Sequence, residues 1–143
     1  MRVKVLFFLS AFIISIAFSS CKKYDYGPFI SFKSKESRIV NKWKLVKVIK
    51  EDQDETYIYL KGIKEFSIEF KNDGNLSKSI TDSAGKNYLS EDKWLFDSDK
   101  MGIYAILDEY HKLYYNIQKL TTKELWLYKE NYNESKYEFE ICN

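Results

Sequence analysis

The side chains that most often act as nucleophiles, metal ligands or proton carriers are scarce in this 143-residue chain. Its two cysteines, Cys21 and Cys142, and its one histidine, His111, lie far apart in the sequence. No pair of them has the spacing of a zinc site, and no phosphate-binding glycine loop or GxSxG nucleophile motif occurs. We therefore expect no enzymatic activity, no cofactor and no metal site.

Two short acidic stretches, Asp52-Gln53-Asp54 and Asp97-Ser98-Asp99, offer the oxygen ligands that Ca²⁺ prefers. Neither continues into a loop with the full set of such ligands, so we interpret both as polar turns. His111 lies in a predicted turn, where we expect a solvated side chain. Cys142 has no partner for an intramolecular disulfide if Cys21 is modified, and we expect it to be a small apolar residue near the end of the last strand.

Cys21 is the one residue to which the sequence assigns specific chemistry, because of what precedes it. Arg2 and Lys4 are followed by an apolar run at residues 5–18 and then by two small residues, which is the pattern of a secretory signal. A transmembrane helix needs about 20 apolar residues, so this run is too short to span a bilayer. The alternative is an ordinary signal peptide cut near Ser20, which would leave Cys21 as an incidental thiol.

The stretch Phe18-Ser19-Ser20-Cys21 resembles the lipobox of bacterial lipoproteins, in which small residues lead directly into a lipid-modified cysteine. The resemblance implies that the Cys21 thiol carries a diacylglycerol and that the freed α-amine is acylated. Several acyl chains on one residue give stable anchoring, whereas a single chain binds a membrane only marginally. The Lys22-Lys23 pair is similar to that of lipoproteins from Bacteroidetes-like bacteria, and no aspartate follows Cys21 as an inner-membrane retention signal. We expect a cell-envelope protein anchored in the outer membrane of a Gram-negative bacterium.

The sequence predicts a signal peptide at residues 1–20, a lipidated N-terminus and tether at 21–37, and one domain at 38–143. Loss of Arg2 and Lys4 from the 23 basic residues leaves as many basic residues as there are acidic ones, 21. This balance gives no reason to expect a nucleic-acid partner. The aromatic residues of the tether are unusual for a solvated linker. We expect residues 29–32 to dock on the domain and a short helix to form within residues 33–40.

From residue 38 onward, segments of strand length alternate with turn signals. Asp73-Gly74 marks a tight hairpin, because this dipeptide tolerates the positive φ that such turns need. A break in the alternation at Leu45-Val46 predicts a bulge. We expect an all-β antiparallel up-and-down meander of eight or nine strands that closes on itself and so removes its edges. The expected strands are residues 43–49, 56–60, 64–70, 76–81, 88–96, 103–107, 113–118, 124–129 and 136–142.

Alternation along the last four strands separates an apolar inward face from an outward face. The outward face carries a candidate surface patch, Tyr104, Tyr114, Trp126 and Tyr128. Three explanations of this patch are open. The aromatics can form a surface that binds a partner, they can be present only because aromatic residues favour strands, or the tether can pack over them. In the expected register Tyr114 and Tyr128 share one cross-strand row, and Tyr104 and Trp126 share another. That register pairs Leu107 with Leu113, Ile117 with Leu125, and Leu127 with Tyr137.

Four short motifs in this region resemble the small bacterial lipocalin-like domain family. They are NKWKLV at residues 41–46, IEFKNDGNL at 68–76, KWLF at 93–96 and IQKLTTKELWL at 117–127. Asn41 stands where the family usually has a glycine. The resemblance covers about residues 38–142 and implies an eight-stranded up-and-down barrel, often carried by lipoproteins.

An eight-stranded barrel is wide enough either to be filled by side chains or to hold one small ligand. The large inward residues predict a mostly filled barrel with a shallow cavity at one mouth. We expect a non-enzymatic binding module for a small apolar or glycan-like ligand. The alternative is a protein-interaction, inhibitor or immunity-type lipoprotein that binds an envelope protein through the outward patch. The candidate ligand-lining residues are Trp43, Phe66, Phe70, Trp94, Tyr115 and Tyr137.

Overall fold

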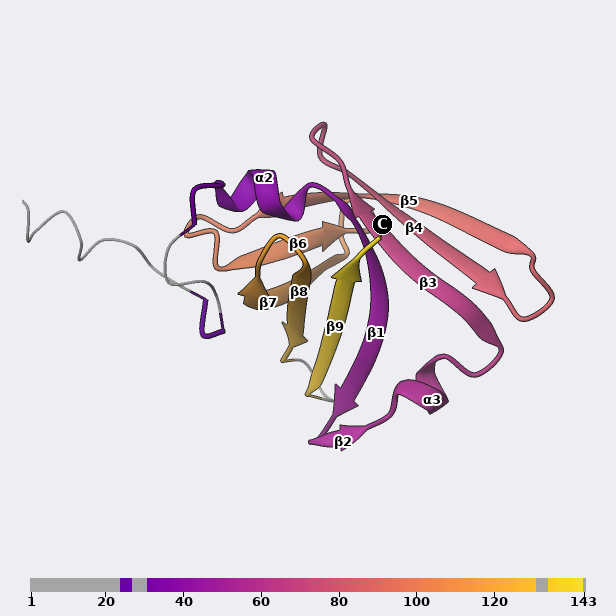
Figure 1. Ribbon diagram of the computed structural model, residues 1–143. Helices are drawn as coiled ribbons and strands as arrows, with labels where there is room; N and C mark the ends of the chain where they lie inside the picture. Colours follow the sequence, from indigo (N-terminus) through magenta and orange to yellow (C-terminus); the bar gives the residue numbers. More distant parts are fainter. Residues whose placement is uncertain (1–23, 27–30, 131–133, 143) are drawn as a thin grey trace, which may run out of the picture.

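The computed structural model describes residues 24–26, 31–130 and 134–142, which contain nine strands and two short helices. The strands form one antiparallel sheet in the order β2-β1-β3-β4-β5-β6-β7-β8-β9, and β1 also pairs with β9. The sheet therefore closes into an eight-stranded barrel with β2 as an extra strand, which confirms the predicted fold class (Figure 1). The elements are α2 (Lys35–Ile39), β1 (Lys42–Lys50), β2 (Gln53–Asp54), α3 (Thr56–Tyr59), β3 (Ile63–Phe70), β4 (Asn75–Asp82), β5 (Asn87–Phe96), β6 (Gly102–Ile106), β7 (Lys112–Leu120), β8 (Glu124–Lys129) and β9 (Ser135–Ile141).

The hairpin turn, the bulge and the first helix form as predicted. Gly74 has a φ of 81° in the turn between β3 and β4, a value that a side chain would make unfavourable. The pairing of β1 with β9 shifts between Leu45 and Lys47, where the sequence indicated a bulge. Ser34 caps α2 by accepting a hydrogen bond from the Ser37 N–H at 3.1 Å. Neither helix of the described residues is both long and apolar enough to cross a membrane.

The strand expected at residues 56–60 is wrong, because the chain forms the helix α3 there. Thr56 Oγ1 accepts a hydrogen bond from the Val48 N–H at 2.9 Å and donates one to Asp54 Oδ1 at 2.6 Å. Asp54 Oδ1 also accepts the Thr56 N–H at 3.0 Å. Short-range side-chain bonds of this kind compete with strand pairing, so the strand ends with Gln53–Asp54.

The expected register between β6 and β7 is also wrong. Leu113 pairs with Ala105 rather than with Leu107. The loop begins earlier than expected because Asp108 Oδ1 accepts the N–H groups of Tyr110 and His111, at 2.8 and 2.9 Å. Leu107 therefore lies beyond the end of β6.

The register of β7 with β8 also differs from the predicted one by two residues, whereas the register of β8 with β9 agrees with the prediction. Ile117 pairs with Leu127 instead of Leu125, and the register then shifts before Lys119. Leu127 pairs with Tyr137, as predicted. The slips at Leu113 and Ile117 are each two residues long, so the predicted inward and outward faces survive, because strand side chains alternate with a period of two.

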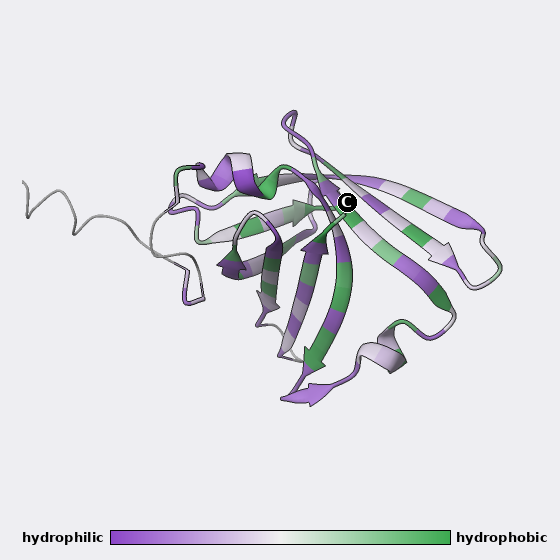
Figure 2. Cartoon of the chain, in the orientation of Figure 1, coloured by the Kyte–Doolittle hydropathy of each residue, from purple (hydrophilic) through white to green (hydrophobic). Residues whose placement is uncertain are grey.

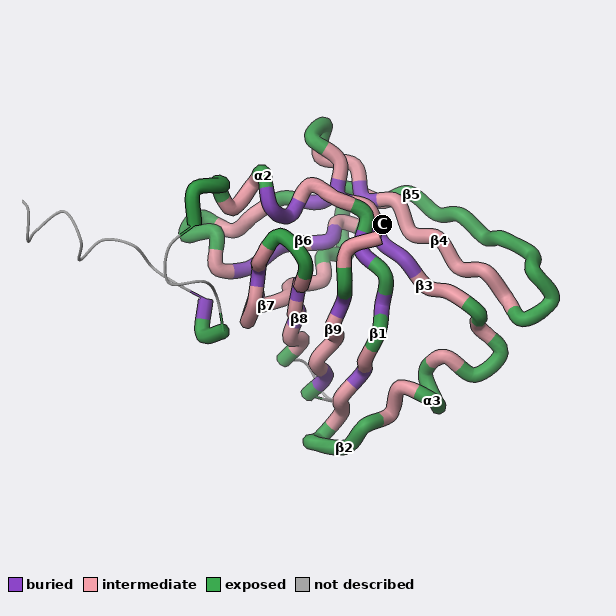
Figure 3. The backbone as a smooth tube through the Cα atoms, in the orientation of Figure 1, coloured by how far each residue is buried: buried purple, intermediate pink, exposed green. Residues whose placement is uncertain are grey.

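One end of the barrel is closed by α2 and by two tryptophans. Trp43 is fully buried, and its Nε1–H donates to the Ile39 carbonyl at 2.8 Å. The Trp94 Nε1–H donates to the Lys71 carbonyl at 3.1 Å, in the turn that follows β3. Figure 3 shows buried residues at the end of α2 and at intervals along β1. This closed end therefore combines apolar burial with satisfied indole donors.

The opposite end, beside α3, is more open. β1 pairs with β3 only at Lys42, Trp43 and Lys44. Beyond Lys44 the two strands separate, and the segment of chain that leads from β1 to β3 at this end contains α3 (Figure 1). Hydrophobic and hydrophilic residues alternate along the strands that form the wall (Figure 2). The turn between β4 and β5 and the first half of β5 are exposed, whereas most of β4 is half-buried (Figure 3). Several exposed apolar residues belong to this end: Tyr57, Ile58, Tyr88, Leu89, Leu107 and Tyr110.

Candidate functional site

A mainly apolar cavity of about 100 Å³ lies inside the barrel on the side of α3. Its walls come from α3 and from β3, β4, β6, β7, β8 and β9. For comparison, an apolar cavity of about 150 Å³ holds one benzene molecule. A narrow aliphatic group therefore fits this cavity, whereas a ring requires a wall to move. The lining residues are Tyr59, Phe66, Ile68, Phe70, Leu76, Lys78, Ile103, Ala105, Leu113, Tyr115, Leu127, Tyr137 and Phe139.

Three tyrosines form an aromatic cluster along the cavity wall. The Tyr137 ring lies 5.8 Å from that of Tyr59 and 6.3 Å from that of Tyr115, and both pairs meet edge to face. Burial raises the pKa of Tyr115 to about 12, with further contributions from Tyr137 and Tyr59. Burial also raises the pKa of Tyr59 above its ordinary value. These hydroxyls therefore stay protonated at neutral pH and can donate hydrogen bonds.

The sequence did not identify Tyr59 as a site residue, because it assigned residues 56–60 to a strand. The helix α3 turns the Tyr59 ring toward Phe66, at 6.4 Å between ring centroids, so that it covers part of the cavity. The signal for this helix was the Asp54-x-Thr56 pattern, since both side chains commonly bond nearby backbone groups at helix starts.

The predicted lining residues divide between the cavity and the closed end. Phe66, Phe70, Tyr115 and Tyr137 line the cavity. Trp43 and Trp94 do not line it; they are buried in the core at the closed end, as described above. The large indoles fill that end of the barrel, so the open space lies on the side of α3.

Lys78 is the only charged residue among those that line the cavity, and it is not one of the lining residues predicted from the sequence. It lies on β4 between the inward positions of Leu76 and Ile80. Its ammonium forms an ion pair with the carboxylate of Asp92 on the neighbouring strand β5. A lysine at an inward position breaks the strict apolar alternation, and this break was the signal in the sequence.

The outward patch is partly covered by the chain itself. Tyr104 pairs directly with Tyr114, and their ring centroids lie 5.1 Å apart. The Tyr114 hydroxyl donates to Asp97 Oδ2 at 3.0 Å, and its ring occupies the space that a Cβ on Gly102 would need. Tyr128 pairs with Asn116. The expected rows, which placed Tyr114 with Tyr128 and Tyr104 with Trp126, are therefore wrong.

Trp126 is covered by side chains from three other parts of the chain. The Tyr26 ring lies 5.3 Å from it, and the Tyr26 N–H donates to the Gln118 carbonyl at 3.0 Å. The ammonium groups of Lys119 and Lys136 lie 4.3 and 4.0 Å from the ring. The patch is thus not an uncovered aromatic surface.

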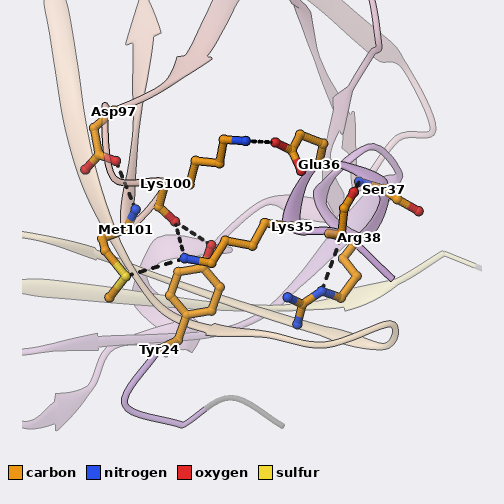
Figure 4. Close-up of polar contacts among 9 residues, drawn as sticks. Tyr24, Lys35, Glu36, Ser37, Arg38, Asp97, Lys100 and Met101 are labelled. Carbon is orange, nitrogen blue, oxygen red and sulfur yellow. Dashed lines mark hydrogen bonds and ion pairs between the residues drawn. The ribbon is translucent and has the colours of Figure 1, made fainter. Parts of the chain in front are cut away.

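The N-terminal segment docks on the barrel through Tyr24 as well as Tyr26. Tyr24 is only 4% exposed, and its hydroxyl donates to the Lys100 carbonyl at 2.7 Å (Figure 4). The Lys35 ammonium lies 4.5 Å from the Tyr24 ring. Desolvation raises the pKa of Tyr24 well above its ordinary value. Phe32, expected to dock, is instead fully exposed, and residues 29 and 30 lie outside the described part of the chain, as does Cys21.

No group of three or more histidine, cysteine or acidic side chains within the described residues is placed to hold a metal ion. Asp54 bonds Thr56, and Asp97 accepts the Met101 N–H at 2.9 Å as well as the Tyr114 hydroxyl. His111 is exposed in the loop before β7 and contacts Asp108. Cys142 follows β9, and burial raises the pKa of its thiol.

Several solved structures resemble this chain, two of them from Bacteroides. A lipocalin-like protein from Bacteroides uniformis ATCC 8492 matches with a TM-score of 0.56 and 16% identity, over 73% of this chain and 99% of that one. An uncharacterized protein from Bacteroides eggerthii DSM 20697 matches over the same shares, with a TM-score of 0.54 and 15% identity. No protein-family model and no curated protein matches the chain. The closed barrel and these neighbours together show that the chain has a lipocalin-like fold.

Proposed function

We propose that this chain is a cell-envelope lipoprotein whose barrel binds a small apolar ligand without catalysing a reaction. The observation that carries the proposal is the mainly apolar cavity inside the barrel beside α3. Small-molecule sites typically combine such a space with a few polar groups that orient the ligand. The lipocalin-like neighbours support the architecture of a binding module, but a fold alone assigns no ligand.

The chemistry of the walls favours an apolar ligand over a glycan. Besides the three tyrosine hydroxyls and the Lys78 ammonium, the side chains that line the cavity are aliphatic or purely hydrocarbon aromatic groups. A sugar bears hydroxyls around the whole edge of its ring, and burying them against such walls without partners costs free energy. An aliphatic group gains free energy on the same transfer.

The lipid anchor is supported by the sequence before the barrel. The apolar run at residues 5–18 and the small residues before Cys21 form a lipoprotein signal, and the absence of an aspartate after Cys21 favours the outer membrane. Only two residues separate Cys21 from the buried Tyr24. A lipid on Cys21 would therefore hold the barrel close to the membrane surface.

The alternative, a protein-binding surface made of the outward patch, receives less support. Trp126 is covered by Tyr26, Lys119 and Lys136, and Tyr114 is engaged with Asp97. A binding hot spot needs an aromatic anchor that a partner can reach. The presence of a cavity and the covering of Trp126 both favour the ligand-binding function.

Binding of 1-hexanol, a narrow aliphatic probe, tests the proposal. The chain from residue 21 onward keeps every described residue, and Cys21→Ser removes competing lipid. Saturable changes in the methyl NMR signals of Ile103 and Leu127 are expected, because both residues line the cavity. Ala105→Leu should weaken binding about tenfold or more by filling the space, since cavities tolerate little added volume.

Ala84→Leu serves as the matched control, because Ala84 is exposed in the turn between β4 and β5. It should bind 1-hexanol as the unmodified barrel does. Absence of saturable shifts, or equal binding by the Ala105→Leu and Ala84→Leu variants, would contradict the proposed function.

A further inference from the structure

The ion pair between Lys78 and Asp92 occupies a position where a barrel wall is normally apolar. Lys78 stands opposite Ile68 on β3 and Ser90 on β5, while Asp92 stands opposite Leu76. The side chains of Lys78 and Asp92 are 29% and 14% exposed, so both are largely withdrawn from water. Lys78 is among the residues that line the cavity and Asp92 is not, so of the two charged residues it is the lysine that borders the ligand space.

The stability of the barrel does not explain this pair. Ion pairs that are partly exposed contribute little to stability, and buried pairs can often be replaced by apolar residues without loss. Leu76 and Ile80, the neighbouring inward positions on β4, are apolar. An apolar residue at position 78 would therefore complete the wall at least as well, and the charge calls for another explanation.

Lys78 and the tyrosines provide the cavity with unused hydrogen-bond donors. An ammonium group carries three N–H donors, and Asp92 is the acceptor that the structure gives it. Within the described residues, the hydroxyls of Tyr59, Tyr115 and Tyr137 form no hydrogen bond with another protein group. A ligand that contacts these groups needs hydrogen-bond acceptors. A ligand that contacts the ammonium gains most binding free energy if it is an anion.

We infer that the ligand of this cavity is a short-chain aliphatic carboxylate whose head group is bound by Lys78. This inference rests on the proposed function and specifies the ligand class of the same site. The aliphatic chain occupies the apolar space between Ile103, Leu113 and Leu127, and the carboxylate accepts hydrogen bonds from the Lys78 ammonium. The cavity volume of about 100 Å³ restricts the ligand to one with a narrow, unbranched chain. Asp92 competes with the ligand for the ammonium and so moderates the affinity.

Three probes that share one chain length separate the head group from the tail: hexanoate, 1-hexanol and hexylamine. Calorimetric titration of the chain from residue 21 onward, with Cys21→Ser, should rank hexanoate about tenfold tighter than 1-hexanol, because a hydrogen bond to a charged group is stronger than a neutral one. Hexylamine should bind most weakly, since its ammonium meets that of Lys78. Equal affinities for hexanoate and 1-hexanol would overturn the inference and leave the proposed function intact.

Variants of the two charged residues give opposite expectations. Lys78→Met keeps the length of the side chain and should weaken hexanoate about tenfold and 1-hexanol much less, so that hexanoate loses its advantage. Saturable binding of 1-hexanol by this variant also shows that the barrel is folded. Asp92→Asn frees the ammonium and should strengthen hexanoate. Lys71→Met, which breaks an exposed ion pair of 3.3 Å with Glu91, is the matched control and should bind as the unmodified chain does.

Two outcomes would overturn the assignment of Lys78. One is hexanoate affinity that Lys78→Met leaves unchanged, and the other is a loss of hexanoate affinity as large in Lys71→Met as in Lys78→Met. Failure of both hexanoate and 1-hexanol to bind the unmodified chain would instead contradict the proposed function itself, and this inference with it.

Discussion

At the scale of single residues, Tyr115 shows how position within the barrel determines chemical behaviour. It is an inward residue of β7 that lines the cavity and lies near Tyr137 and Tyr59. Burial favours the neutral phenol, which raises its pKa to about 12. No hydrogen bond joins the Tyr115 hydroxyl to another described residue. Because no fully buried polar side-chain atom of the described residues lacks a partner, this hydroxyl keeps some exposure through which a ligand can reach it.

This pKa predicts a specific loss of stability at alkaline pH. Above pH 10 the unfolded chain releases the Tyr115 proton, whereas the folded chain keeps it until about pH 12, so the folded state binds more protons and its stability falls as pH rises between these values. Below pH 10 the contribution is fully present. In urea unfolding, Tyr115→Phe should reduce the stability lost between pH 10 and 12 by on the order of 2 kcal/mol.

Tyr110→Phe is the control, because Tyr110 is exposed in the loop before β7. It should leave the alkaline stability profile unchanged. Identical profiles for Tyr115→Phe and the unmodified chain would show that Tyr115 ionises as readily in the barrel as in the unfolded state.

At the scale of elements, the two short helices mark opposite ends of the barrel. α2 lies at the closed end, where Ile39 accepts the Trp43 indole N–H and Arg38 Nη1 donates to the Leu120 carbonyl at 2.6 Å. α3 lies at the open end and brings Tyr59 over the cavity. The segment at Tyr24 belongs to the closed end, because its hydroxyl bonds the loop between β5 and β6 and its ring contacts Lys35 of α2 (Figure 4).

The docking of Tyr24 should contribute measurably to stability. Tyr24→Phe removes one hydrogen bond and should cost about 1 kcal/mol. Tyr24→Ala also removes a buried ring and should cost about 3 kcal/mol. Phe32→Ala, a change of the exposed aromatic in the same segment, should lie within about 0.5 kcal/mol of the unmodified chain in urea unfolding. A Tyr24→Ala chain as stable as Phe32→Ala would mean that the segment does not dock in solution.

At the scale of the whole molecule, the docked segment gives the anchor proposal a geometric consequence. The three residue steps from Cys21 to Tyr24 span at most about 10 Å. A strand of eight to ten residues, such as β4 or β5, is roughly 25–30 Å long. A lipid on Cys21 would hold the closed end near the bilayer, and the cavity beside α3 would face away from it.

Fluorescence quenching in vesicles tests this orientation. In a Cys142→Ser background, a probe on Ser98→Cys, in the loop beside Lys100, should be strongly quenched by nitroxide lipids. A probe on Ile58→Cys, exposed on α3, should be quenched weakly. Similar quenching at both positions would contradict the orientation. Labelling with a palmitate analogue tests the lipid anchor independently of the orientation. Label that persists in Cys21→Ala would refute lipid attachment at Cys21.

Much of the fold was predictable from local sequence, and the reason is geometric. Turns depend on a few adjacent residues, so Asp73-Gly74 placed a hairpin correctly. Faces depend only on the period of two, so Phe66, Phe70, Tyr115 and Tyr137 were correctly expected to point inward. Register was predicted less well, because it depends on loop hydrogen bonds such as those of Asp108, which periodicity does not reveal.

The sequence by itself determined most of the strand-and-turn pattern and the division into faces, and the proposed signal that ends at Cys21 rests on the sequence alone. Only the tertiary structure decided that Trp43 and Trp94 fill the closed end and that the space lies on the side of α3. It also decided that Lys78 meets Asp92 beside that space, and that Tyr59 covers it. Alternation is a property of each strand alone, whereas a cavity arises from the packing of many strands around a closed barrel, which no single segment encodes.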